Sequence, residues 1–132
     1  MELKIKVLLA KLGLDIHNRG VLTVAKNLRD AGMEIIYIGN STPEQIIKSA
    51  VQEDVDVVGV SSLGGAHLSL GAKLISLAKK EGIKDGKIYL VGGAIPEDDM
   101  KKLNAAGFDG IFTSGATKDE IISTIKNLAK KL

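Results

Sequence analysis

Short apolar runs rich in Val, Ile and Leu alternate five times along this chain with longer segments whose apolar residues recur at helical spacing. We expect strands at Ile5–Leu9, Glu34–Ile38, Val55–Val60, Lys87–Val91 and Gly110–Phe112. We expect helices at Gly20–Ala31, from about Thr42 to Glu53, and at Ala66–Glu81, Pro96–Ala106 and Thr117–Leu132. This alternation is typical of a parallel sheet whose two faces are both covered by helices.

Capping signals support these helix boundaries. The segment Ser41–Glu44 combines hydroxyl side chains with a proline suited to a first helical turn, and an acidic residue follows at once. Thr117, with Glu120 three residues later, is a second candidate N-cap. Gly32 follows the first helical segment as a candidate C-cap.

Right-handed crossovers between consecutive parallel strands fold such a chain into an open, doubly wound sheet. We therefore expect an α/β protein of the flavodoxin-like (Rossmann-like) type, with five parallel strands in the order 2-1-3-4-5. The 132 residues suit one domain, 1–132. Aromatic residues make up only 3% of the chain, so its core must be aliphatic. Unrelated functions share this fold, and the fold alone identifies none of them.

Composition excludes several classes of function. The chain has no cysteine, which removes disulfides, thiolate zinc sites and cysteine nucleophiles. Its net charge is +2, its lysines are scattered and its aromatics are few, so we expect no nucleic-acid partner. No apolar run approaches the roughly 18 residues of a membrane span, and residues 1–10 do not resemble a signal peptide. We therefore expect a cytoplasmic protein with no membrane partner.

Glycine-rich loops follow three of the predicted strands. These loops are Lys11–Gly20, Ser61–Gly65 and Gly92–Pro96, and they hold six of the 15 glycines. In open parallel sheets, ligands bind beyond the carboxyl ends of the strands, where the strand order reverses. Glycine lets the backbone approach a ligand closely. We therefore expect a binding site at this edge, formed by these three loops.

The first loop contains a candidate metal ligand. It lacks the glycine spacing of phosphate-binding loops, and it places Asp15 two residues before His17. A carboxylate that accepts a hydrogen bond from one imidazole nitrogen leaves the other nitrogen unprotonated and able to bind a metal. The same pair can instead be a helix-capping carboxylate beside an exposed histidine, and Ser61 and Ser62 can simply cap the helix that follows them.

Three motifs together match a known signature in order and position. They are Asp15-x-His17-x-x-Gly20, Ser61-x-Leu63 and Gly92-Gly93, each placed after the expected strand. With them the chain resembles, over essentially its whole length, the cobalamin-binding domains of the base-off/His-on class. The amino-acid sequence is most similar to that of methylmalonyl-CoA mutases in four segments: Ala10–Asp15, Thr42–Ile46, Val60–Leu63 and Val91–Pro96.

The resemblance implies a lower axial ligand for cobalt. His17 would replace the dimethylbenzimidazole base of cobalamin, and Asp15 would hydrogen-bond His17. Lys11 would extend that relay by pairing with Asp15. The nucleotide tail of the cofactor would run into a slot beside the sheet. The implied cofactor-binding residues are Asp15, His17, Asn18, Arg19, Gly20, Ser61, Leu63, Gly64, Gly92, Gly93 and Gly115.

The function implied by the resemblance is that of the cobalamin-binding subunit of an adenosylcobalamin-dependent carbon-skeleton mutase, with methylmalonyl-CoA mutase expected first. A separate large subunit would hold the acyl-CoA substrate, because a substrate barrel needs about 250 residues of its own. The isolated chain would then be inactive.

Alternatives stay open. Within the class, the chain suits a 2-hydroxyisobutyryl-CoA or glutamate mutase, or a corrinoid protein for methyl transfer. A response-regulator receiver needs an Asp where the third strand ends in Ser61, and a flavodoxin needs aromatics that this chain lacks. His67, the only other histidine, is expected on the surface at a helix start.

Overall fold

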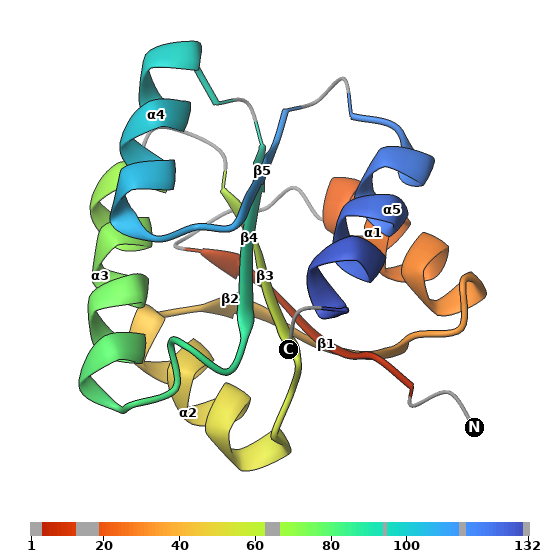
Figure 1. Ribbon diagram of the computed structural model, residues 1–132, viewed down its shortest axis with the longest axis horizontal. Helices are drawn as coiled ribbons and strands as arrows, with labels where there is room; N and C mark the ends of the chain where they lie inside the picture. The colour runs from red at the N-terminus through yellow and green to blue at the C-terminus, as the bar shows by residue number, and fades with distance from the viewer. Residues whose placement is uncertain (1–3, 13–18, 63–66, 94, 114–115, 131–132) are drawn as a thin grey trace.

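The computed structural model describes residues 4–12, 19–62, 67–93, 95–113 and 116–130. Within them, strand and helix alternate five times (Figure 1). The strands are β1 (Lys6–Leu12), β2 (Glu34–Ser41), β3 (Val57–Ser62), β4 (Ile88–Gly93) and β5 (Gly110–Phe112). The helices are α1 (Arg19–Asp30), α2 (Pro43–Glu53), α3 (His67–Lys80), α4 (Glu97–Ala106) and α5 (Lys118–Ala129). Each predicted strand and helix therefore has a counterpart in the structure.

The five strands form one parallel sheet in the order β2-β1-β3-β4-β5, which confirms the predicted flavodoxin-like arrangement. Figure 1 shows α1 and α5 on one face of the sheet, and α2, α3 and α4 on the other. The strand order reverses between β1 and β3. The carboxyl ends of these two strands therefore flank the position where ligands bind in open parallel sheets.

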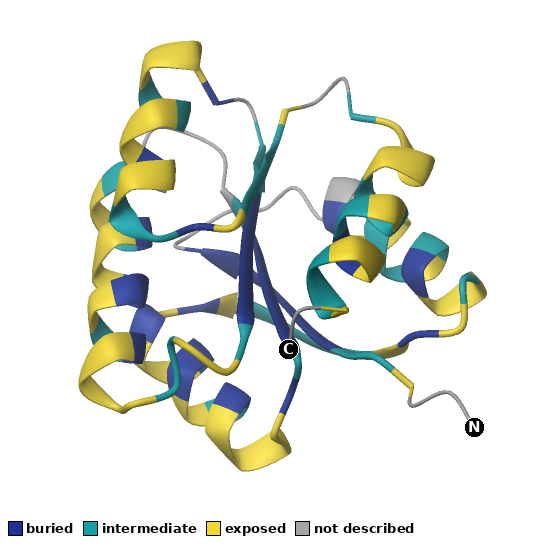
Figure 2. Cartoon of the chain, viewed as in Figure 1, coloured by how far each residue is buried: buried dark blue, intermediate teal, exposed yellow. Residues whose placement is uncertain are grey.

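Alternate residues of each strand enter two separate cores. On β1, Val7 and Leu9 belong to the core beneath α1 and α5, while Leu8 and Ala10 belong to the core beneath the other three helices. This period of two follows from the pleat of a strand. Figure 2 shows the middle of the sheet as the most deeply buried part of the molecule. Because both faces are covered, the inner strands are apolar on both sides.

Several strands extend further toward the carboxyl edge than the sequence predicts. β1 ends at Leu12 rather than Leu9. The reason is inter-strand pairing, because Lys11 is the register partner of Ser61 on β3. β4 likewise continues to Gly93, two residues past its predicted end. Residues predicted as loop are therefore held in the sheet by its backbone hydrogen bonds.

The pairing of β2 with β1 is irregular near the carboxyl end of β1. Leu9 pairs with Tyr37, whereas Lys11 pairs with Asn40, so β2 contains one extra residue between these pairs. Gly39, with φ of 71°, takes up the local bend, a conformation that favours glycine. This bulge places the end of β2 beside the end of β1.

The helix caps agree with the sequence signals. The Thr42 hydroxyl accepts a hydrogen bond from the Gln45 N–H at 3.2 Å, and the Gln45 side chain accepts one from the Thr42 N–H at 2.9 Å. The Thr117 hydroxyl accepts from the Glu120 N–H at 3.2 Å, which confirms the predicted cap of the last helix. Within the described residues, no helix is both long enough and apolar enough to cross a membrane.

Candidate functional site

The carboxyl ends of the strands meet in one row across the sheet. From edge to edge the row contains Asn40, Lys11, Ser61, Gly92 and Phe112, each the register partner of the next. The pairing thus brings three of the predicted site residues onto adjacent strands. By strand alternation, Lys11, Ser61 and Gly92 all lie on the face that α1 and α5 cover. The expected edge of the sheet therefore collects these three positions on one side.

Lys11 is a buried cation at this edge. Its side chain is 1% exposed, which is rare for an ammonium group. Burial of an unpaired charge costs several kcal/mol, and Lys11 takes part in an interaction within the chain. The loop that carries the predicted Asp15 and His17 starts directly after β1 and lies outside the described residues. The relay through these three residues therefore stays a prediction.

A groove of about 550 Å³, which we call the slot, lies between the sheet and helices α1 and α5. Residues of β1, β3, β4 and β5 form its floor, and residues of the two helices form its walls. Pockets that bind small molecules typically enclose roughly 300–1,000 Å³. The slot is therefore large enough for a substantial part of a cofactor.

The slot is polar near the carboxyl edge and largely apolar at depth, where Asn27, beside Leu28 on α1, adds one amide group. Ser61, Thr113 and Lys118 line it near the edge, and Thr23 and Asn27 add polar groups along the α1 wall. The deeper floor and walls are formed by Val7, Leu9, Leu28, Leu90 and Ile125. Val7 precedes the edge row by four residues, or roughly 13 Å along the strand. The arrangement suits an elongated ligand whose far end is apolar.

Three positions along the slot are occupied by glycine, and replacement would have a different consequence at each. Gly93 has φ of 146°, a conformation that other residues rarely adopt. A Cβ on Gly59 would lie 2.8 Å from Leu9 Cδ2, so a side chain there would have to displace the end of the Leu9 side chain. A Cβ on Gly92 would meet nothing closer than the Phe112 carbonyl oxygen at 3.6 Å, an ordinary contact. The fold does not require a glycine at position 92, and its missing side chain leaves space in the slot.

Apart from Lys11, which lies in β1, the predicted site residues fall into three groups. Ser61, Gly92 and Gly93 line the slot. Arg19 and Gly20 begin α1. The remaining predicted residues lie outside the described residues: Asp15, His17, Asn18, Leu63, Gly64 and Gly115.

Sequence reasoning missed the deeper part of the slot. Gly59 lies two residues before Ser61, and the two-residue period of a strand could have placed it on the same face. Ile121 and Ile125 have the spacing of any apolar helix face, which does not separate a slot wall from a core. Lys118 has no sequence signal that distinguishes it from the other helix lysines.

A smaller groove of about 350 Å³ lies between α4 and β5. Met100 and Asn104 line it from the helix, with Phe108 and Asp109 beside them. In the part of the chain that the structure describes, no three His, Asp or Glu side chains gather as metal ligands.

Comparison with known proteins adds sequence relatives. A family model described as "B12 binding domain" matches residues 5–123. The chain is 43% identical to the 2-hydroxyisobutanoyl-CoA mutase small subunit of Aquincola tertiaricarbonis, over 94% of this chain and 91% of the relative. It is 41% identical to the pivalyl-CoA mutase small subunit of Xanthobacter autotrophicus, over 96% and 85%. It is 42% identical to the methylmalonyl-CoA mutase large subunit of Propionibacterium freudenreichii, of which it spans 18%.

Solved structures show the same fold in proteins of more than one kind. A cobalamin-binding protein from Desulfitobacterium hafniense superposes with a TM-score of 0.82 at 17% identity, over 94% of this chain and 58% of that one. The response regulator CheY4 of Vibrio cholerae superposes with a TM-score of 0.72 at 16% identity, over 96% and 99%. At these identities the likeness shows the fold alone, so the choice between such proteins depends on the sequence relatives and the site.

Proposed function

The chain belongs to the B12-binding domain family, and from this premise we propose that it is the cobalamin-binding small subunit of an adenosylcobalamin-dependent acyl-CoA mutase. Two relatives that match along most of both chains are named as small subunits of CoA mutases. Methylmalonyl-CoA is the substrate expected first from the sequence, and those names add 2-hydroxyisobutanoyl-CoA and pivalyl-CoA. The proposal includes a cytoplasmic location, which suits a chain without cysteine.

The slot is the observation that carries the proposal. When its base leaves cobalt, cobalamin presents a tail in which an anionic phosphodiester and a ribose lead to an apolar, methylated aromatic base. The slot offers polar and then apolar groups in the same order, with the Ser61 and Thr113 hydroxyls near the carboxyl edge and Leu90 and Ile125 at depth. Gly92 leaves room between them. The residues present therefore fit the tail of this cofactor.

We assign to His17 the role of the residue that would hold the cobalt of the cofactor. Asp15 would hold the imidazole by accepting a hydrogen bond from its other ring nitrogen, and Lys11, which is buried, would pair with Asp15. Partners of this kind fix the orientation of a metal-binding histidine and raise its basicity. The proposed contacts that complete the site are Asn18, Arg19, Gly20, Ser61, Leu63, Gly64, Gly93 and Gly115.

When bound, adenosylcobalamin supplies a radical by homolysis of its cobalt–carbon bond. The residues of this chain bind the cofactor tail, exclude water from the buried base and set the position of the proton on His17. A separate large subunit, built around a barrel, holds the acyl-CoA. The isolated chain binds the cofactor and turns over no substrate.

Reconstitution tests this proposal. The chain is combined with adenosylcobalamin and a large mutase subunit from the same organism, and methylmalonyl-CoA, 2-hydroxyisobutanoyl-CoA, pivalyl-CoA and glutamate are offered in turn. We expect turnover of a CoA thioester only when all components are present. Turnover of glutamate alone would assign the chain to another mutase of the class. Failure to bind adenosylcobalamin, with or without the large subunit, would refute the proposal.

A further inference from the structure

One formal charge lines the slot within the described part of the chain. Among the described residues that line it, only Lys118 is charged. Its ammonium group forms no ion pair or hydrogen bond with another residue in the described part of the chain. The positive charge is therefore available to a ligand in the slot.

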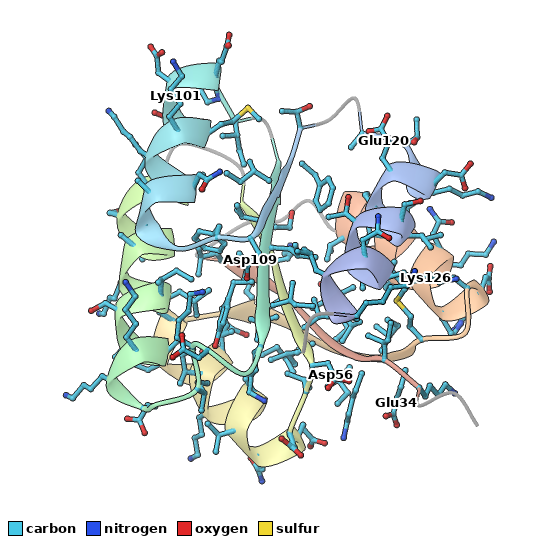
Figure 3. The ribbon with its side chains drawn as sticks, in the orientation of Figure 1. Glu34, Asp56, Lys101, Asp109, Glu120 and Lys126 are labelled. Carbon is cyan, nitrogen blue, oxygen red and sulfur yellow. The ribbon has the colours of Figure 1, made fainter. Side chains whose placement is uncertain are left out.

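Lys118 lies at the end of the slot nearest the carboxyl edge of the sheet. It is the first residue of α5, directly after the loop that leaves β5. Ile125 lines the slot from the same helix, seven residues later and about 10 Å further along its axis. Figure 3 shows Glu120 near this end of α5 and Lys126 lower on the same helix. The cation is thus at the polar end, and the apolar wall lies below it.

The cofactor tail carries its single negative charge at the matching position. Its phosphodiester lies between the corrin side chain and the ribose, and the base follows. If the base occupied the apolar depth of the slot, the phosphodiester would lie toward the carboxyl edge, where Lys118 begins α5. A lysine ammonium is a compact charge on a flexible stem and pairs well with phosphate oxygens. The Thr113 hydroxyl lines the same end and can donate a hydrogen bond.

We propose that Lys118 binds the phosphodiester of the cofactor tail, so that the chain favours complete corrinoids over corrinoids that lack the nucleotide. This assignment rests on the proposed function. It gives Lys118 a binding role that depends on charge, and salt screens such a role.

Affinity measurements on the full chain test the assignment. The unmodified chain, Lys118→Gln and Lys126→Gln are titrated with cobalamin and with cobinamide, which lacks the phosphodiester, ribose and base. Lys126 is exposed and does not line the slot, so its variant removes the same charge from the same helix. At low salt we expect Lys118→Gln to bind cobalamin about two- to fivefold more weakly, the range of an exposed ion pair. The difference should disappear at high salt, and Lys118→Arg should restore part of the affinity.

Two results would overturn the assignment. One is equal cobalamin affinity for Lys118→Gln and Lys126→Gln at low salt. The other is an equal loss of affinity for cobinamide, which would show that Lys118 acts on something other than the phosphodiester. Absence of cobalamin binding by the unmodified chain is a different result, because it contradicts the proposed function itself before any variant is compared.

Discussion

Replacement of Gly92 by isoleucine should stabilise the cofactor-free chain and weaken its binding of cobalamin. A Cβ at this position meets only ordinary contacts, the closest being the Phe112 carbonyl oxygen at 3.6 Å. The backbone of β4 therefore accepts a side chain here. That side chain enters the slot, because Gly92 lies on its lining.

The two effects have opposite signs and can be estimated separately. Glycine within a strand costs roughly 0.5–1 kcal/mol relative to alanine, and β-branched residues favour strands further. The free energy of unfolding should therefore rise by about 0.5–1 kcal/mol in Gly92→Ile. Overpacking of a closed site typically costs about 1–3 kcal/mol, which corresponds to a loss of cobalamin affinity of about 5- to 150-fold. Gly92→Ala should show a smaller loss of affinity in the same direction.

Urea denaturation of the cofactor-free chain and titration with cobalamin measure these quantities on the same samples. Gly86→Ala is the matched control, because a Cβ there meets nothing within 4 Å and Gly86 does not line the slot. It should leave cobalamin affinity unchanged. Unaltered affinity in Gly92→Ile would refute the slot as the site of the tail. Reduced stability of this variant would refute our reasoning that the fold does not require a glycine at position 92.

Further predictions concern the buried cation, a helix cap and a buried phenol. Lys11→Met should retain the fold and bind cobalamin about 10- to 100-fold more weakly, the usual effect of losing an outer partner of a metal-binding histidine; native affinity in the titration would contradict the relay. Thr42→Ala should lower the free energy of unfolding in urea by about 1 kcal/mol and leave cobalamin affinity unchanged. Burial, with Asp109 nearby, raises the pKa of Tyr89. The contribution of the neutral Tyr89 phenol to the free energy of unfolding is therefore complete below the ordinary tyrosine pKa of about 10. This contribution is lost as the pH rises through the raised pKa. In Tyr37→Phe, tyrosinate absorbance should thus appear only as the chain unfolds, and its appearance in the folded chain near pH 10 would contradict this.

Much of the fold follows from local patterns that the sequence displays directly. The apolar run at β1 and the Thr-Pro start of α2 predict their elements because strand burial and helix capping depend on neighbouring residues. The ends of strands are harder to predict. Lys11 belongs to β1 because Ser61 pairs with it from 50 residues away in the sequence, and no local pattern records that partner.

The site shows the same division. The glycines Gly92 and Gly93 were visible as a motif, but only the paired strands show that Gly92 has free space and Gly93 a backbone that requires glycine. Gly59 and Lys118 were not singled out, because each enters the slot through the packing of α1 and α5 against the sheet. The packing of helices against the sheet decides which residues line the slot, and local sequence patterns do not reveal that packing.

The central claim is that this chain binds cobalamin with His17 as the lower axial ligand. Electron paramagnetic resonance of cob(II)alamin mixed with excess protein, prepared with and without nitrogen-15-labelled histidine, tests it most directly. The account predicts nitrogen splitting of the cobalt lines that changes with the label and disappears in His17→Ala. Cobalamin that stays free, or that binds with its own base still on cobalt, would contradict the account.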